Sequence, residues 1–347
     1  MDAPPVQYAR TDDGYNIAYT VCGNGPPLLV TPAPFNHALN DWDQSAAKGR
    51  WLTALSQRFR LIHYDSRGQG LSSRGLRPGL SMEDYEKDLE AVVTQTGLRR
   101  FVLLGFLTFS HVAMRYASTH REQVEALILL NGRADGGAGS ALAAFGDLAR
   151  NDWEGFLEVM SRTTSSIQDP VLAKRRARET ITQADYLMQT ETTSASNVKD
   201  VAASLTVPTL LLAADSAAWN FGTEAAAREL AGLIADSRMV LFGHTNAGIY
   251  APSGETPPNI AAIEAFLADV ASREAQRPST MTRKLSLSAR ELDVLRLIIA
   301  SKTSREIAET LVLSIRTVER HIANIYAKTD THGRVQVTQY ALSNGLV

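Results

Sequence analysis

The chain contains one cysteine, Cys22, among its 347 residues. A single cysteine excludes a disulfide framework within the chain and a four-cysteine zinc site. No stretch approaches the roughly 18 to 20 consecutive apolar residues that cross a bilayer, and the first residues lack the basic and apolar segments of a signal peptide. No internal repeat or low-complexity tract is visible. These absences favour a cytoplasmic protein that contacts no membrane.

Length and charge indicate two parts with different partners. A chain of 347 residues is too long for one ordinary hydrophobic core, so two domains are expected. The net charge is −2, yet residues 281–347 hold ten Lys and Arg against six Asp and Glu. A basic end on an acidic body suits a segment that meets phosphate groups.

The larger, N-terminal part alternates short apolar runs with amphipathic stretches. The apolar runs are NIAYTV, PPLLVT, FRLIHY, FVLLGF, ALILLN, TLLLAA and RMVLF. This alternation predicts an α/β fold with a mainly parallel, doubly wound sheet. Residues of about 133–205 hold no convincing strand and predict a helical cap over the carboxyl edge of the sheet, where ligands bind in open α/β folds. We expect a body at 1–272, a linker at 273–283 around Pro278, and a tail at 284–347.

The tail predicts four helices. Ser288 to Glu291 and Thr303 to Glu306 are capping boxes, each opening a helix. A tight connection through Val312 and Leu313 leads to a third helix, IRTVERHIANIYAKTD, which Ser314 caps. A fourth helix, RVQVTQYALSN, is expected to end at Gly345.

The third helix has one apolar and one polar face. Val318, Ile322 and Ile325 form the apolar stripe, which is expected to be buried. A helix in the major groove needs hydrogen-bonding side chains on its other face, with the first turns nearest the bases. The predicted DNA-contacting residues are Thr303, Arg316, Thr317, Glu319, Arg320, His321, Ala323, Asn324 and Lys328. Among these, Thr317, His321 and Lys328 suit phosphate contacts, Arg320 suits guanine edges, and Glu319 suits cytosine. A solvated helix in a generic bundle is the plainer alternative.

The segments LSARELDVLRLI, SREIAETLVLSIRTVERHIANIYAKTD and GRVQVTQYAL resemble the LuxR-type (FixJ/NarL-type) helix-turn-helix along its whole length. One departure is Ser304, where that family often has Asn. The resemblance implies binding to double-stranded DNA as a homodimer whose fourth helix supports dimerisation. Two recognition helices then meet half-sites about one DNA turn apart, which predicts an inverted repeat. RNA polymerase is a further candidate partner.

The body resembles an α/β-hydrolase from DGYNIAYTVCGNGPPLLVTP through FVLLGFLTFSHVAMRYASTHREQVEALILLN, and again at VPTLLLAAD and IAAIEAFLADV. It is most similar to hydrolase domains that are fused to LuxR-type tails or to nucleotide cyclases, as PFNHALNDWD indicates. An active member carries G-x-S-x-G after the strand. Here the segment is Gly105-Phe106-Leu107-Thr108-Phe109, so Leu107 stands at the nucleophile position. Phe109 replaces the second glycine and is expected to crowd the turn, and Ser110 is expected to lie already on the helix.

The other catalytic positions that the resemblance implies are also degenerate. Asp215 lies just before the expected acid position, which Ala217 occupies in the simplest register. His244 takes the histidine position only if the loop is shortened, because a gap-free register places Asn246 there. In the loop equivalent to the oxyanion loop, Pro32 lacks a backbone donor. A Ser-His-Asp system needs all three groups, so we expect no enzyme.

The replaced catalytic residues leave two interpretations of the old cleft. Leu107 and Phe109 either fill the core of a dead scaffold or help line an apolar ligand pocket. The candidate pocket residues are Phe35, His37, Trp42, Phe106, Leu107, Trp219, His244 and Tyr250. His63 and Tyr64 are interpreted as structural. The loop Asp65-Ser-Arg67-Gly68-Gln-Gly70 lacks the phosphate-cradling pattern, and we expect neither a cofactor nor a metal.

Three functions remain open from the sequence. The favoured one is a transcription regulator whose body senses a small, largely apolar effector. The second is an enzyme tethered to DNA that uses a His244–Asp215 pair. The third is a structural body that only dimerises the tail. The sequence does not distinguish an activator from a repressor.

Overall fold

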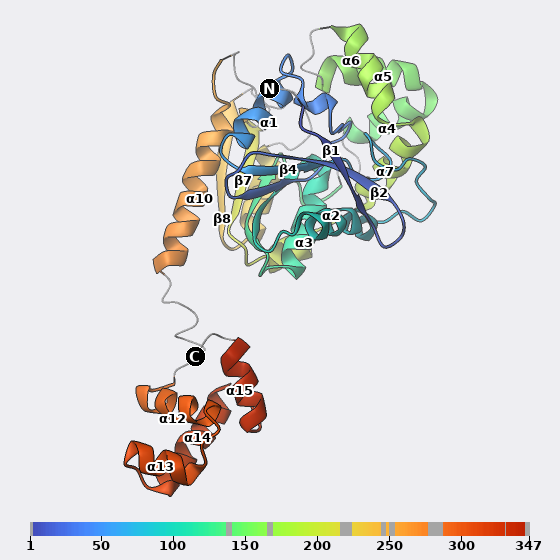
Figure 1. Ribbon diagram of the computed structural model, residues 1–347. Coiled ribbons are helices and arrows are strands. Elements are labelled where there is room, and N and C mark those ends of the chain that lie inside the picture. The colour runs from blue at the N-terminus through green and yellow to red at the C-terminus, as the bar shows by residue number, and fades with distance from the viewer. Residues whose placement is uncertain are drawn as a thin grey trace. The chain divides into compact units, whose positions relative to one another are not determined.

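The computed structural model describes residues 3–136, 141–164, 169–215, 224–243, 248–249, 254–276, 287–329 and 331–343 (Figure 1). The chain divides into two compact units, Met1–Val270 and Ala271–Val347. Each unit has hydrophobic clusters of its own. None of the helices within the described ranges is long and apolar enough to cross a membrane.

The described part of the N-terminal unit contains one eight-stranded sheet with the order β1-β2-β4-β3-β5-β6-β7-β8. Only β2 runs antiparallel to its neighbours β1 and β4, and every other pair is parallel. This confirms the predicted mainly parallel α/β fold. The strands are β1 Val6–Arg10, β2 Asn16–Cys22, β3 Pro27–Val30, β4 Arg60–Tyr64, β5 Phe101–Phe106, β6 Val124–Leu130, β7 Thr209–Asp215 and β8 Ser237–Gly243.

Strand β1 was not among the seven predicted runs. It pairs only with β2 at the edge of the sheet, and most of its side chains are exposed or half-buried. An edge strand with little buried surface needs no continuous apolar run, so hydrophobic pattern alone gives a weak signal for it.

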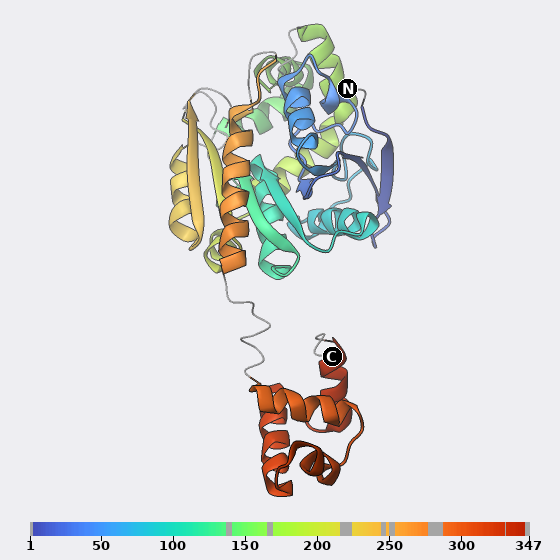
Figure 2. The same cartoon turned by 60° about the vertical axis from the view of Figure 1, so that its left-hand side comes forward.

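Helices cover both faces of the sheet, which makes the fold doubly wound. Helices α2, α3, α8 and α9 contribute to the apolar cluster on one face, and α1 and α10 contribute to the cluster on the other. Figure 2 shows α10 lying along its face of the sheet. These helices are α1 Ala47–Ser56, α2 Met82–Thr96, α3 Ser110–Thr119, α8 Lys199–Ser204, α9 Glu224–Leu233 and α10 Pro258–Gln276.

In the described part of the segment between β6 and α8, four helices form the cap, which lies at one end of the sheet in Figure 1. They are α4 Ala141–Asn151, α5 Trp153–Thr164, α6 Pro170–Thr180 and α7 Gln183–Ala195. The cap has its own apolar cluster, in which the rings of Trp153, Phe156 and Tyr186 stack or tilt against one another at centroid distances of 4.6 to 5.8 Å. The chain therefore inserts a separately packed helical layer between two strands of the sheet.

The C-terminal unit consists of helices in its described part. They are α12 Ala289–Ile299, α13 Ser304–Leu311, α14 Ile315–Thr329 and α15 Arg334–Ser343. Their buried side chains, among them Val294, Ile307, Val318 and Val337, form one cluster. The four predicted helices are thus present, whereas the expected end at Gly345 lies outside the described residues.

Helix α10 extends into the segment that was predicted to be a linker. Helix α10 continues to Gln276, four residues into the segment expected to be a linker from residue 273. The residues between Ala271 and Gln276 include good helix formers and no proline or glycine, so nothing local ends the helix before Pro278. Residues 277–286 lie outside the described part.

Candidate functional site

The turn after β5 keeps the sharp geometry of a nucleophile elbow. Strand β5 ends at Phe106, a single 3-10 turn covers Leu107–Phe109, and α3 begins at Ser110. Leu107 has φ of 50°, in the left-handed region that side chains other than glycine rarely adopt. The backbone strain of an elbow is therefore present with a leucine at its tip, and Ser110 lies on the helix, as predicted.

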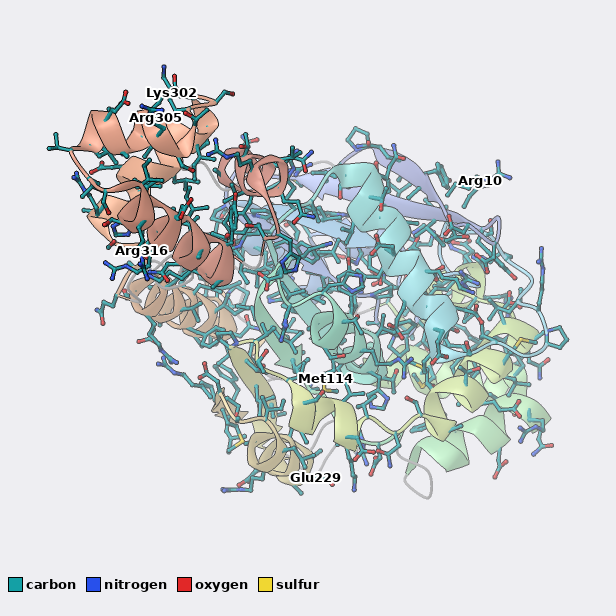
Figure 3. The ribbon with its side chains drawn as sticks, turned by 90° about the horizontal axis from the view of Figure 1, so that it is seen from below. Arg10, Met114, Glu229, Lys302, Arg305 and Arg316 are labelled. Atoms are coloured by element: carbon teal, nitrogen blue, oxygen red, sulfur yellow. The ribbon has the colours of Figure 1, made fainter. Side chains whose placement is uncertain are left out.

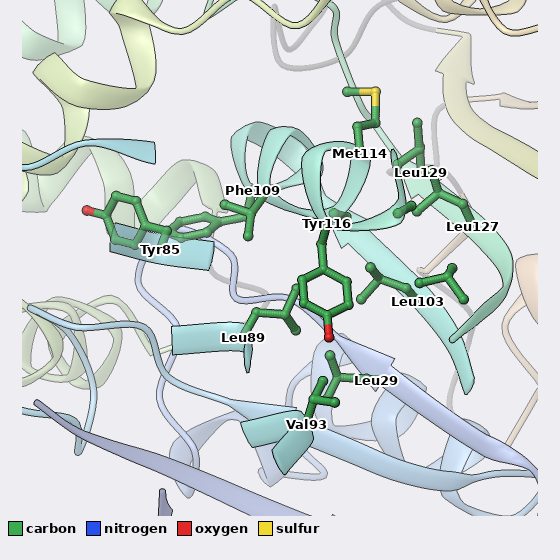
Figure 4. Close-up of a cluster of buried hydrophobic side chains, with 14 of the residues drawn as sticks. Leu29, Tyr85, Leu89, Val93, Leu103, Phe109, Met114, Tyr116, Leu127 and Leu129 are labelled. Atoms are coloured by element: carbon green, nitrogen blue, oxygen red, sulfur yellow. The ribbon is translucent and has the colours of Figure 1, made fainter. Parts of the chain in front are cut away.

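Gly105 and Phe109 explain how this turn fits. A Cβ added at Gly105 would lie 2.8 Å from Ala113 Cβ and from Ser110 Cα, so only glycine allows α3 to approach the strand. The prediction that Phe109 crowds the elbow is wrong. Its ring is buried and packs edge-on against Tyr85 of α2 at a centroid distance of 5.2 Å (Figure 4). The 3-10 turn thus places the Phe109 side chain in the apolar cluster on the α2 face of the sheet.

In the loop after β3, at the position of an oxyanion loop, polar groups form hydrogen bonds within the protein. The Phe106 backbone N–H donates to Thr31 Oγ1 at 3.0 Å. Pro32 has no N–H, and the N–H of Ala33 donates to Asn36 Oδ1 at 3.4 Å. The backbone N–H groups of Phe106 and Ala33 therefore both have partners within the protein.

The positions of the other two catalytic groups are only partly described. Asp215 is the last residue of β7, and its backbone pairs with Gly243 at the end of β8. The candidate residues Ala217, Trp219, His244, Asn246 and Tyr250 lie outside the described residues.

Three of the predicted pocket residues belong to one apolar cluster on the α1–α10 face. Trp42 and Phe106 are buried within it, and half-buried Leu107 packs against it. The ring of Phe106 meets that of Trp51 edge-on at 6.3 Å. The Trp42 Nε1–H is buried and has no hydrogen-bond partner among the described residues. Leu107 therefore packs against an apolar cluster that also contains Trp42 with its unused donor.

Phe35 and His37 lie apart from that cluster. Phe35, at φ of 60°, places its ring 5.9 Å from Phe156 and 5.7 Å from Tyr186, in the aromatic cluster of the cap. It is therefore a contact between the loop after β3 and the cap. His37 Nδ1 accepts from the backbone N–H groups of Leu39 and Asn40, and burial lowers the pKa of His37.

A buried polar network beneath this loop was not predicted. Asn36 Oδ1 lies 3.0 Å from His63 Nε2 and 2.8 Å from Lys48 Nζ, and its Nδ2 donates to Asp65 Oδ1 at 2.8 Å. Lys48 also pairs with Asp41 at 2.7 Å. Burial lowers the pKa of His63 to about 4 and raises that of Asp65 to about 7. His63 is fully buried and contacts Asn36. Asn36 and Lys48 belong to no motif from which this contact could be predicted.

A second set of hydrogen bonds, also not predicted, joins the segment that enters the cap after β6 to the segment that leaves it after α7. His111 Nδ1 lies 2.8 Å from Ser196 Oγ at the end of α7, and its Nε2 lies 3.1 Å from the Arg133 carbonyl after β6. The Val198 N–H donates to the Ala134 carbonyl at 2.8 Å beside it. Because a neutral imidazole donates from one nitrogen only, Nε2 donates to the carbonyl and Nδ1 accepts from the serine. Burial lowers the pKa of His111 to about 4.

In the C-terminal unit, both predicted capping boxes are present. The Glu291 N–H donates to Ser288 Oγ, and the Glu291 carboxylate accepts from the Ser288 N–H. Thr303 and Glu306 make the same reciprocal pair at the start of α13. Ser314 caps α14 by accepting from the Thr317 N–H at 3.1 Å. These caps satisfy backbone donors that a helix leaves unpaired at its first turn.

Helix α14 has the two faces that its sequence predicts. Val318 and Ile325 are buried, and Ile322 packs partly buried against the same core. The residues of the predicted reading face are exposed: Arg316, Glu319, Arg320, Ala323 and Asn324. The arrangement can present two guanidinium groups and a carboxylate to base edges.

The three residues predicted to contact phosphate groups differ in exposure and in their contacts. Thr317 and His321 are half-buried. Lys328 Nζ pairs with the buried Glu291 carboxylate at 2.8 Å and so holds α14 against α12. Lys328 thus has a structural contact in addition to its predicted phosphate contact, and its residue remains exposed.

The turn between α13 and α14 is strained. Val312, the C-cap of α13, has φ of 55° and ψ of 50°. Glycine or asparagine commonly takes this left-handed position, because a β-branched side chain fits it poorly. The Val312 side chain is 90% exposed, so no core contact compensates the strain.

Family models match both parts of the chain. Residues 285–341 match the model of bacterial regulatory proteins of the luxR family. Residues 35–179 match the model of the alpha/beta hydrolase fold. Both matches fall where the geometry places a helix-turn-helix and a capped parallel sheet.

Curated relatives match one part at a time. The transcriptional regulatory protein LiaR of Bacillus subtilis is 48% identical over 62 residues, which are 18% of this chain and 29% of LiaR. The putative carbamate hydrolase RutD of Cronobacter turicensis is 31% identical over 87 residues, 24% of this chain and 33% of RutD. The chain thus covers about a third of the length of the curated relatives that it matches.

Among solved structures, a bromoperoxidase from Bacillus anthracis superposes with a TM-score of 0.63 at 20% identity. The match covers 76% of this chain and all of the bromoperoxidase chain. At that identity the likeness shows the fold alone. The chain therefore carries an N-terminal domain with the α/β-hydrolase fold and a C-terminal helix-turn-helix domain of the luxR family of bacterial regulatory proteins.

Proposed function

We propose that the protein is a DNA-binding transcription regulator whose hydrolase-fold domain binds a small, largely apolar molecule without consuming it. The observation that carries the proposal is Leu107, which occupies the tip of an intact elbow at φ of 50°. A leucine side chain cannot attack a carbonyl carbon. A strained conformation that is kept without its nucleophile supports a remaining use for the site.

The groups around the elbow support binding more than catalysis. Pro32 lacks an N–H, and the Ala33 N–H is engaged by Asn36, so stabilisation of an oxyanion is weakened. Leu107, Trp42 and Phe106 contribute to one apolar cluster, and the Trp42 Nε1–H has no partner in the described part of the chain. Ligand sites are mostly apolar with a few orienting polar groups. An apolar ligand with one hydrogen-bond acceptor fits this chemistry.

The exposed face of α14 supports the DNA-binding half of the proposal. Arg316 and Arg320 are exposed and not ion-paired within the described ranges. We propose that a homodimer presents two such helices to an inverted repeat in double-stranded DNA. The effector changes DNA affinity only if it binds two states of the protein with different affinity.

A thermal-shift screen of the full chain tests ligand binding. The panel contains esters, lactones, amides and aromatic acids, which resemble hydrolase substrates. A ligand at a hundred times its dissociation constant stabilises the folded state by about 2.7 kcal/mol, which is a readily measured rise in Tm. The rise should be saturable and should disappear in Leu107→Trp. The matched control is Val171→Trp on α6, where the side chain is 77% exposed, and it should keep the rise.

Two outcomes of this screen and a hydrolysis assay oppose the proposal. If no compound shifts Tm and none changes DNA affinity, a purely structural body is favoured. Turnover of p-nitrophenyl esters by the wild-type protein, lost in His244→Ala, would replace the proposal by a DNA-tethered hydrolase.

A further inference from the structure

Two large apolar side chains are exposed where the recognition helix begins. Val312, in the turn before α14, is 90% exposed, and Ile315, the first residue of α14, is 47% exposed. The clustered core of this domain lies elsewhere, on the side of Val318 and Ile325. Neighbouring exposed apolar side chains at a turn favour contact with something outside the domain.

The strain at Val312 supports this view. A β-branched residue at φ of 55° is unfavourable, and an exposed valine gains nothing from burial in return. Asparagine or glycine would relieve the strain at no cost in core packing. Strained residues that the fold does not require are found preferentially at binding sites.

The surroundings of Ile315 favour DNA as the partner. Residues four apart share a flank of a helix, so Ile315 lies in line with Glu319 and Ala323 of the reading face. Arg316 is next to Ile315 in the chain and is exposed, and Figure 3 shows Arg316 at the surface of this domain. A basic side chain next to a small apolar surface fits a polyanion that exposes apolar groups.

In the major groove the 5-methyl group of thymine is the one apolar group on a base edge, and alanine and other apolar side chains contact it. The first turn of a recognition helix lies nearest the bases. We propose that Ile315 contacts a thymine 5-methyl group and so determines a thymine in each half-site, with Val312 shielding this contact from water. This inference rests on the proposed DNA binding.

Uracil tests the proposal directly because it pairs as thymine does and lacks only the methyl group. A consensus site is first selected with the full chain from a randomised DNA duplex library. Each thymine of one half-site is then replaced in turn by deoxyuridine, and Kd is measured by fluorescence anisotropy. At one thymine, the wild-type protein should bind the deoxyuridine duplex about fourfold more weakly, the factor expected for one buried methyl group.

The variant Ile315→Ala should lose this discrimination, so that its Kd values for the two duplexes agree. The control Val335→Ala removes a 74% exposed valine from α15 and should keep the wild-type ratio, whatever its affinity. Equal discrimination in Ile315→Ala and the wild type, or none at any thymine in the wild type, would overturn the role of Ile315. Failure to select any site would instead count against DNA binding itself.

Discussion

At the residue level, position 107 has the backbone conformation of a nucleophile elbow but carries a leucine, which has no nucleophilic group. The elbow conformation depends on Gly105, which lets α3 approach, and on Phe109, which anchors the turn against Tyr85. Neither contact involves the hydroxyl of a nucleophile. The turn can therefore form with a leucine at its tip. The hydrolase fold does not depend on a nucleophile at this position.

His111 gives a prediction at the same level. Burial lowers its pKa to about 4, below the ordinary value of 6.5, so the unfolded chain binds one more proton between these pH values. The His111 contribution to the free energy of unfolding is therefore complete above pH 6.5 and is lost as pH falls toward 4, by up to about 1.4 kcal/mol per pH unit. Replacement by a residue that does not titrate should remove this dependence.

The measurement is urea unfolding of the wild type and of His111→Asn between pH 4.5 and 7. The variant loses the bonds to Ser196 and Arg133 and should be less stable at pH 7. The difference between the two proteins should shrink as pH falls, because only the wild type must protonate His111 on unfolding. His63 and Asp65 are present in both proteins, so their contributions to the pH dependence cancel in the difference. A difference that is constant with pH would contradict the assignment.

At the level of elements, the turn between α13 and α14 is less stable than it could be. Val312→Asn should raise the free energy of unfolding of the C-terminal domain by about 1 kcal/mol, because asparagine adopts the left-handed conformation readily. Chemical denaturation followed by circular dichroism measures the change. The matched control Val335→Asn places asparagine at an exposed valine in the first turn of α15, where the backbone is not left-handed and no strain is relieved, so it should give no gain. If the two variants behave alike, strain at Val312 is not the cause.

Elements also differ in how far the sequence predicted them. The helices of the tail were predicted together with their capping boxes, because a cap involves residues three apart in the chain. Strand β1 was missed, since its pairing with β2 supplies its stability and its own residues bury little surface. Helix α10 extends four residues into the expected linker, where no proline or glycine stands before Pro278.

At the level of the whole molecule, the chain contains two independently cored units. The cluster around Val294, Ile307 and Val318 belongs entirely to the C-terminal unit. We expect a fragment of residues 277–347 to unfold cooperatively in a thermal melt, because its core needs no residue of the body. Val294→Asp, which buries a carboxylate at a position with no exposed surface, should abolish the transition. A fragment without a cooperative transition would show that the domain depends on the rest of the chain.

The sequence by itself determined the α/β class, the helix-turn-helix and the leucine at the nucleophile position. Each of these depends on periodicity, caps or a motif within a short stretch, and those are local properties of the chain. Only the tertiary structure decided that Phe109 packs away from the elbow, that Phe35 joins the cap, and that Lys328 pairs with Glu291. Such contacts join residues far apart in sequence, and their geometry follows from how the elements pack against one another.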